Sequence, residues 1–188
     1  MPSVTIPLFE RRRTARHRRA LAYWAVLLGM SASLLVGASV APPQWLHYCA
    51  LFVHLGSVIL GLGAAVTLEF QGLLWMKGRR SLEELRQSER AVSPLAWLGI
   101  IGLLTSGALL EPSLHDPLTV IKMLAVLVVG LNGVGMTRLT AELRRMPPRT
   151  RFTSLPRAIK LWCIWSAVLS QAGWWTAVLI GMLNTAGH

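Results

Sequence analysis

Two ionisable side chains interrupt long apolar stretches and are the first candidates for chemistry. His54 lies roughly 13 Å along one such stretch, and Lys122 lies roughly 7 Å along another, at 1.5 Å per helical residue. A titratable side chain is costly inside a membrane, so such residues mark candidate functional sites. An imidazole can ligate a metal, and a lysine can hold an anion or, when neutral, ligate iron.

The helical face that carries His54 is built of small side chains. At 100° per residue, four small residues fall within about 60° of it: Ala50, Ser57, Gly61 and Ala65. An imidazole on such a face suits an axial haem ligand, because small neighbours let the porphyrin plane lie against the helix. The alternative is a histidine that is bonded to a neighbouring helix, at Asn132, Ser170 or Gln171.

Lys122 also has two interpretations. Its long stem could carry the charge toward the headgroups or toward Asp116. In a functional site it would be a second axial ligand, a partner of a haem propionate, or a charge that faces an anionic substrate.

The elements that position these residues are five apolar segments. The chain has 188 residues, of which 53% are hydrophobic and 14% are charged. Each segment is close to the length that a membrane helix needs, and they lie near 21–41, 45–75, 92–110, 118–137 and 161–183. Because backbone groups in lipid must be satisfied internally, we expect an all-α, five-span transmembrane bundle over 21–188, preceded by a basic segment at 1–20.

The cations predict the orientation of this bundle. Of the 19 Lys and Arg residues, 18 lie before the first span, between the second and third, or between the fourth and fifth. The positive-inside rule makes that side cytoplasmic, with the C-terminus outside, as in a bacterial-type inner membrane. We assign the net charge of +11 to topology and to anionic lipids at the cytoplasmic face, and not to nucleic acid. Cleavage of the first span as a signal peptide is the alternative, since Ser39-Val40-Ala41 resembles a cleavage site.

Smaller features complete the prediction. Ser81 and Glu84 have capping-box spacing and predict a short surface helix, and Asp116-Pro117 predicts the start of the fourth span. Cys49 and Cys163 fall near opposite ends of their spans, too far apart for a disulfide, and we expect both to be buried. We expect Trp174 and Trp175 to contact lipid, with the flanking of a ring cofactor as the alternative.

Four short stretches carry a family resemblance: Phe52-Val53-His54-Leu55-Gly56, Gly61-Leu62-Gly63-Ala64-Ala65, Gly102-Leu103-Leu104-Thr105-Ser106-Gly107 and Pro117-Leu118-Thr119-Val120-Ile121-Lys122. Together they resemble the histidine-, glycine- and lysine-bearing helices of HemJ-type protoporphyrinogen oxidases and copper-resistance D-like membrane proteins. The resemblance covers about residues 45–183. It implies a haem-associated pair formed by His54 and Lys122.

The leading prediction is a membrane protein that binds haem b and acts as an oxidoreductase or in electron transfer. His54 would ligate the haem iron, Lys122 would be the second ligand or the propionate partner, and Gly61 would face the cofactor. A redox partner or a second copy of the chain would complete the system. The alternatives are a small-solute or ion transporter, with Asn132 and Gln171 lining a path from Lys122, and an assembly subunit without chemistry.

Overall fold

A computed structural model describes residues 8–112 and 115–186, and this part of the chain is helical throughout its regular structure. The five α-helices and one short 3-10 helix (η1) are α1 (Leu8–Ser39), α2 (Gln44–Met76), α3 (Leu82–Gly107), α4 (Pro117–Leu143), η1 (Phe152–Ser154) and α5 (Arg157–Ala186). The all-α prediction is confirmed. Residues 1–7 of the basic segment lie outside the described residues, and α1 already begins at Leu8, before the expected start of the first span.

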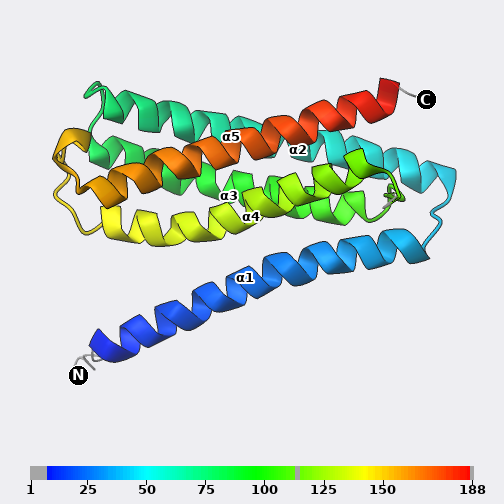
Figure 1. The fold of residues 1–188 in the computed structure, drawn as a ribbon, viewed down its shortest axis with the longest axis horizontal. Coiled ribbons are helices and arrows are strands. Elements are labelled where there is room, and N and C mark those ends of the chain that lie inside the picture. Colours follow the sequence, from blue (N-terminus) through cyan, green and yellow to red (C-terminus); the bar gives the residue numbers. More distant parts are fainter. Residues whose placement is uncertain (1–7, 113–114, 187–188) are drawn as a thin grey trace.

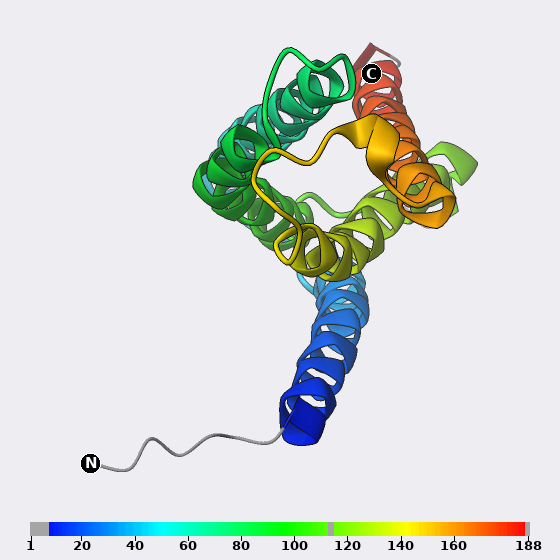
Figure 2. The same cartoon turned by 90° about the vertical axis from the view of Figure 1, so that its left-hand side faces the viewer.

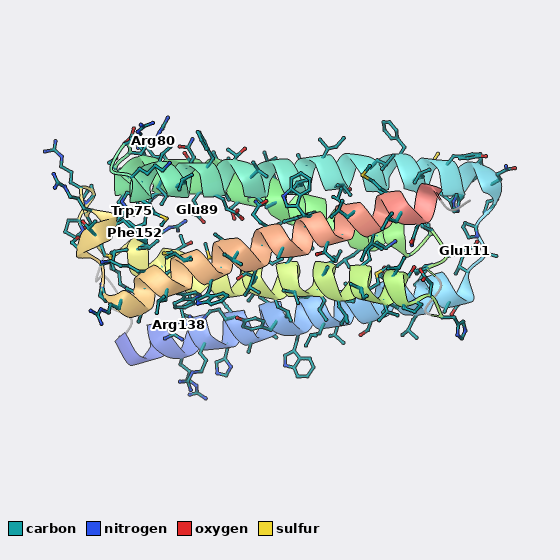
Figure 3. The ribbon with its side chains drawn as sticks, turned by 45° about the horizontal axis from the view of Figure 1, so that its top comes forward. Trp75, Arg80, Glu89, Glu111, Arg138 and Phe152 are labelled. Carbon is teal, nitrogen blue, oxygen red and sulfur yellow. The ribbon has the colours of Figure 1, made fainter. Side chains whose placement is uncertain are left out.

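The connections alternate between the two ends of the molecule (Figure 1). The α2–α3 and α4–α5 connections lie at one end, here called the basic end, where α1 also begins. The α1–α2 and α3–α4 connections lie at the opposite end, here called the far end. Figure 3 shows Arg80, Trp75 and Phe152 together at the basic end and Glu111 at the far end.

Helices α2, α3, α4 and α5 form a closed ring when viewed along the bundle, and α1 projects away from this ring (Figure 2). Within the ring, α2 packs chiefly against α3, and α4 chiefly against α5. α1 contacts α3 and α4; the Ser33 hydroxyl donates to the Leu104 carbonyl at 2.7 Å, and Val26 fills the space beside Gly130.

Four helices are long and apolar enough to cross a membrane: α1 (from Arg13), α2, α4 and α5 (to Asn184). The chain is therefore a membrane protein. α3 falls short by composition because its first turns carry several charged residues, although it runs beside α2 along the bundle (Figure 1).

The expectation of a separate short helix after Ser81 is wrong. The capping box is present, since the Ser81 hydroxyl accepts from the Glu84 amide and the Glu84 carboxylate accepts from the Ser81 amide. The helix that it starts then continues without interruption to Gly107. Pro94 lies within this helix and does not end it.

Small residues allow α2 and α3 to approach each other closely. A Cβ on Gly99 would collide with the backbone of Gly61, and a Cβ on Gly102 would collide with the Ser57 hydroxyl. Close approach through small residues is the usual way in which membrane helices associate, since lipid offers no hydrophobic drive for packing. Most of the small face of α2 is therefore used to bind α3.

Two apolar clusters fill the bundle at different levels. The cluster at the basic end consists of Trp75, Leu82, Leu139, Leu143 and Leu155. The central cluster consists of Ala65, Ile100, Leu103, Val129 and Trp174.

Candidate functional site

His54 and Lys122 meet at one cavity, which lies in the half of the bundle nearer the far end. The cavity has about 40 Å³ of space for water-sized molecules, enough for roughly two or three waters. All five helices contribute to its wall, and apart from His54, Lys122 and Ser33 the lining is apolar or glycine. His54 and Lys122 thus line the same cavity, and their role there stays a prediction.

A hydrogen-bond chain fixes the state of the imidazole. His54 Nδ1 lies 3.0 Å from Ser106 Oγ on α3. The Ser106 hydroxyl is placed to donate its single hydrogen to the Gly102 carbonyl, which leaves its oxygen to accept from Nδ1–H. In this arrangement a neutral imidazole carries its hydrogen on Nδ1, and Nε2 keeps its lone pair. A ring nitrogen free to bind, with the other nitrogen anchored, is the arrangement found in metal-ligating histidines.

Ser106 is the partner that sequence reasoning missed, since Asn132, Ser170 and Gln171 were the expected candidates. Asn132 instead donates to the Ser166 carbonyl at 2.8 Å and accepts from the Ser166 hydroxyl at 2.7 Å. A signal was present in the sequence, because Gly102 and Ser106 are small residues one helical turn apart on α3. That spacing is typical of a helix that packs closely against another.

Lys122 enters the cavity from the second turn of α4, among Met123 and Val126. It lies near enough to interact electrostatically with His54 and with Asp116. No ion pair joins Lys122 to a carboxylate in the described part of the chain.

Asp116 belongs to the helix start, as its sequence position predicted. Its carboxylate accepts from the Thr119 hydroxyl at 2.8 Å and from the amides of Leu118 and Thr119 at 3.1 and 3.0 Å. The hydrogen bond from the Thr119 hydroxyl is the largest cause that holds the pKa of Asp116 below its ordinary value. Asp116 therefore stays ionised as the cap of α4.

Gly61 and Trp174 lie differently from what the sequence suggested. The indole of Trp174 occupies the space that a Cβ on Gly61 would fill, and Gly61 does not line the cavity. Trp174 is 3% exposed, so the expectation of lipid contact is wrong for it, whereas Trp175 is 50% exposed. Because Trp174 belongs both to the central cluster and to the cavity wall, it forms the floor of the site.

The two cysteines are free and lie on different helices, Cys49 on α2 and Cys163 on α5. Cys49 is exposed, so the expectation that it is buried is wrong.

The site fits haem in its ligand chemistry but not in its present volume. His54 offers an unprotonated Nε2, and Lys122 offers a cation on the same cavity. A porphyrin is far larger than a few waters, so the cavity as it stands does not hold the macrocycle.

Among the described residues, no group of three or more His, Cys, Asp or Glu side chains could hold a metal ion without a further cofactor. The resemblance to HemJ-type and copper-resistance D-like proteins stays a prediction from the sequence. Comparison with protein-family models, with curated proteins and with solved structures found no match for this chain.

Proposed function

We propose that this chain is a membrane protein that binds haem b and serves in electron transfer or in an oxidoreductase reaction. The observation that carries the proposal is the state of His54. Its Nδ1–H is held by Ser106, which leaves the Nε2 lone pair on a residue that shares a cavity with Lys122. Haem would supply one-electron chemistry, so the chain itself needs no catalytic carboxylate.

The roles of the residues follow from this arrangement. His54 would bind the iron through Nε2, and Ser106 would hold the ring in the required tautomer and orientation. Lys122 would be the second ligand or would pair with a propionate. The apolar remainder of the wall would exclude water, which strengthens both interactions.

The topology belongs to the same proposal. All five α-helices would span an inner membrane of the bacterial type, with the basic end in the cytoplasm and the C-terminus outside. The basic end would contact anionic lipids. The haem site would then lie in the outer half of the bilayer, within reach of a redox partner on the outside.

Reporter fusions test this topology. A fusion at Gly78, in the α2–α3 connection, is expected to report the cytoplasm, and fusions at Pro42 and after His188 are expected to report the outside. Pro42 lies in the α1–α2 connection at the far end. A cytoplasmic report from the C-terminal fusion would overturn the five-span arrangement.

The visible spectrum of the full-length protein, purified in detergent after expression with ample haem, tests the function. A Soret band with a reduced α-band is expected for the wild type. His54→Ala should lose most of the haem while still inserting, and Lys122→Met, which keeps the stem but removes the charge, should shift the spectrum or reduce the occupancy. His47→Ala is the matched control on the same helix, because His47 does not line the cavity. A folded wild-type protein without haem would overturn the proposal.

Binding of a small anion at Lys122 is the second candidate function. The observation in its favour is the size of the cavity, which suits a few waters or a small ion. The longer path expected for a transporter receives no support, since neither Asn132 nor Gln171 lines the cavity. A colourless, folded protein whose thermal stability rises with chloride, and whose Lys122→Met variant does not respond, would favour this function over haem binding.

A further inference from the structure

The face of α1 that packs on the ring carries an arginine at its basic end. A stripe of buried and half-buried residues recurs along this face at helical spacing: Arg19, Ala22, Val26, Met30, Ser33 and Gly37. Arg19 is the first of them, and each side chain described before it on α1 is exposed. Arg19 therefore lies on the side of α1 that meets the other helices.

Two contacts fix the register of α1 against α4. Val26 fills the space beside Gly130, and the Tyr23 hydroxyl lies 3.5 Å from the position that a Cβ on Gly135 would take. A valine thus spans the interface at one level, whereas a tyrosine is needed one turn nearer the basic end. The two helices run in opposite directions and separate toward that end (Figures 1 and 2).

This register places an arginine of α4 near the level of Arg19. Arg19 lies four residues before Tyr23, and Arg138 lies three residues after Gly135, so each arginine is about one helical turn closer to the basic end. Around α4, Arg138 lies about 80° from Gly130 and about 60° from Gly135, between the two residues that contact α1. The two arginines therefore approach the same interface from opposite helices.

Neither arginine is neutralised within the described part of the chain, where no carboxylate forms an ion pair with either of them. The guanidinium of Arg138 lies over the ring of Trp162 on α5, 5.5 Å from its centroid, and Arg19 Nε donates to a carbonyl of its own helix. The one carboxylate of α4, Glu142, pairs with Arg145 at 3.4 Å. Two like charges at one interface favour an anion between them.

The depth of the two arginines indicates where this anion comes from. Arg19 lies just before the apolar segment at 21–41, and Arg138 directly follows the apolar segment at 118–137. Trp162 lies at the start of the segment at 161–183, and tryptophans at the ends of spans are typical of the headgroup level. Beside Arg19, the side chains of Leu21 and Trp24 are 67% and 61% exposed and offer an apolar surface to acyl chains.

We propose that Arg19 and Arg138 together hold the phosphate of an anionic phospholipid between α1 and α4, with the Tyr23 hydroxyl as a further donor. A guanidinium matches a phosphate with two parallel N–H···O bonds, and basic sites between membrane helices on the cytoplasmic side are suited to lipid headgroups. The lipid would join α1 to the ring where the two separate. This assignment rests on the proposed contact of the basic end with anionic lipid, and not on haem.

Titration of the full-length protein in detergent with lipid, followed by native mass spectrometry, tests the site. Phosphatidylglycerol should bind the wild type, and phosphatidylcholine, whose choline group would meet two cations, should bind more weakly. Arg19→Gln combined with Arg138→Gln should weaken phosphatidylglycerol binding about 30-fold, since each arginine near anionic lipid contributes about fivefold. Arg18→Gln combined with Arg149→Gln is the matched control, because it removes the same charge from two exposed arginines and should leave binding nearly unchanged.

Equal losses in the two double variants would overturn the site, because net charge alone would then explain the binding. Displacement of phosphatidylglycerol by millimolar inorganic phosphate would overturn the lipid assignment in favour of a soluble phosphate ligand. If the double variant fails to fold, single variants decide: Arg19→Lys keeps the charge without the planar fork and should bind more tightly than Arg19→Gln. The opposite order would contradict the site.

The outcome for lipid is separable from the outcome for haem. The haem spectrum should be the same in all of these variants, because the α1–α4 interface at the basic end lies away from the cavity of His54. A colourless wild type that binds phosphatidylglycerol would count against the proposed function alone. A wild type that carries haem and does not bind phosphatidylglycerol would overturn the lipid site alone.

Discussion

At the basic end, buried side chains bond to backbone carbonyls of other elements, whereas in the far-end half His54 and Lys122 border a space. Arg86 is 7% exposed, and its guanidinium donates to the carbonyls of Leu143, the last residue of α4, and of Met146 in the connection that follows. Trp75 Nε1 donates to the Thr150 carbonyl at 3.0 Å and its ring meets Phe152 edge-on. His54 and Lys122, by contrast, face room for a few waters.

The basic end is therefore suited to anchoring the helices, and the cavity is suited to binding a ligand. A helix end whose carbonyls are bonded by a buried arginine gains stability and loses freedom. A cavity costs stability because the side chains that line it lose packing contacts on one side, and a bound ligand restores such contacts. We therefore expect mutations at the basic end to reduce stability, and mutations around the cavity to reduce ligand binding with little effect on stability.

The largest expected effect is the removal of Trp75. Trp75→Ala deletes a side chain that is 3% exposed, and such a truncation costs about 3–5 kcal/mol of unfolding free energy. Trp165→Ala, at a tryptophan that is 61% exposed, is the control and should cost far less. Unfolding in detergent by denaturant measures both. Equal losses of unfolding free energy in Trp75→Ala and Trp165→Ala would contradict the contrast between the packed basic end and the half that holds the cavity.

The next effect is the loss of the Arg86 hydrogen bonds. Arg86→Leu removes the side-chain donor of the Leu143 and Met146 carbonyls and of Glu83, which costs about 1–3 kcal/mol. Arg144→Gln breaks the more exposed pair with Glu89 and should cost no more than about 1 kcal/mol. A ranking of the two variants in the opposite order would show that the exposed network, and not the buried arginine, holds this end together.

A variant at Ser106 tests the same comparison at the cavity. Ser106→Ala releases the Nδ1 of His54, and loss of such an anchor typically lowers the affinity for the metal centre about 10–100-fold. The free energy of unfolding should change by about 1 kcal/mol or less. Haem titration followed at the Soret band gives the affinity, and Ser39→Ala, at an exposed serine bonded within α1, is the control. Unchanged haem affinity in Ser106→Ala would show that Ser106 does not contribute to the site.

The smallest expected effect concerns pH at the capping box. Hydrogen bonds from the backbone amide and the hydroxyl of Ser81 lower the pKa of Glu84 from its ordinary value of 4.5. A lowered folded-state pKa means that the stabilisation is complete above the unfolded-state pKa and is lost as the pH falls through the folded-state pKa. Glu84→Gln should therefore be less stable than the wild type at neutral pH, and the gap should close in acid below pH 4.5. A constant gap in thermal unfolding across this range would contradict the assignment.

Much of the secondary structure followed from the sequence because local rules determine it. The apolar segments predicted helices that the structure contains, and Ser81 and Asp116 predicted the two helix starts at which their side chains accept backbone amides. The length of α3 did not follow. Charged residues near its start resemble a surface helix, and only the packing against α2 carries the helix through Pro94 to Gly107.

The candidate site was likewise only partly predictable from the sequence. The sequence determined that His54 and Lys122 lie at similar depth within two apolar segments, because polarity and spacing along each helix fix the depth of a side chain. Only the tertiary structure decided that Ser106 holds His54 and that Trp174 covers Gly61. The physical reason is that periodicity fixes the face on which a residue lies, whereas the neighbour it meets depends on how closely two helices approach, and here glycines on α2 and α3 set that distance.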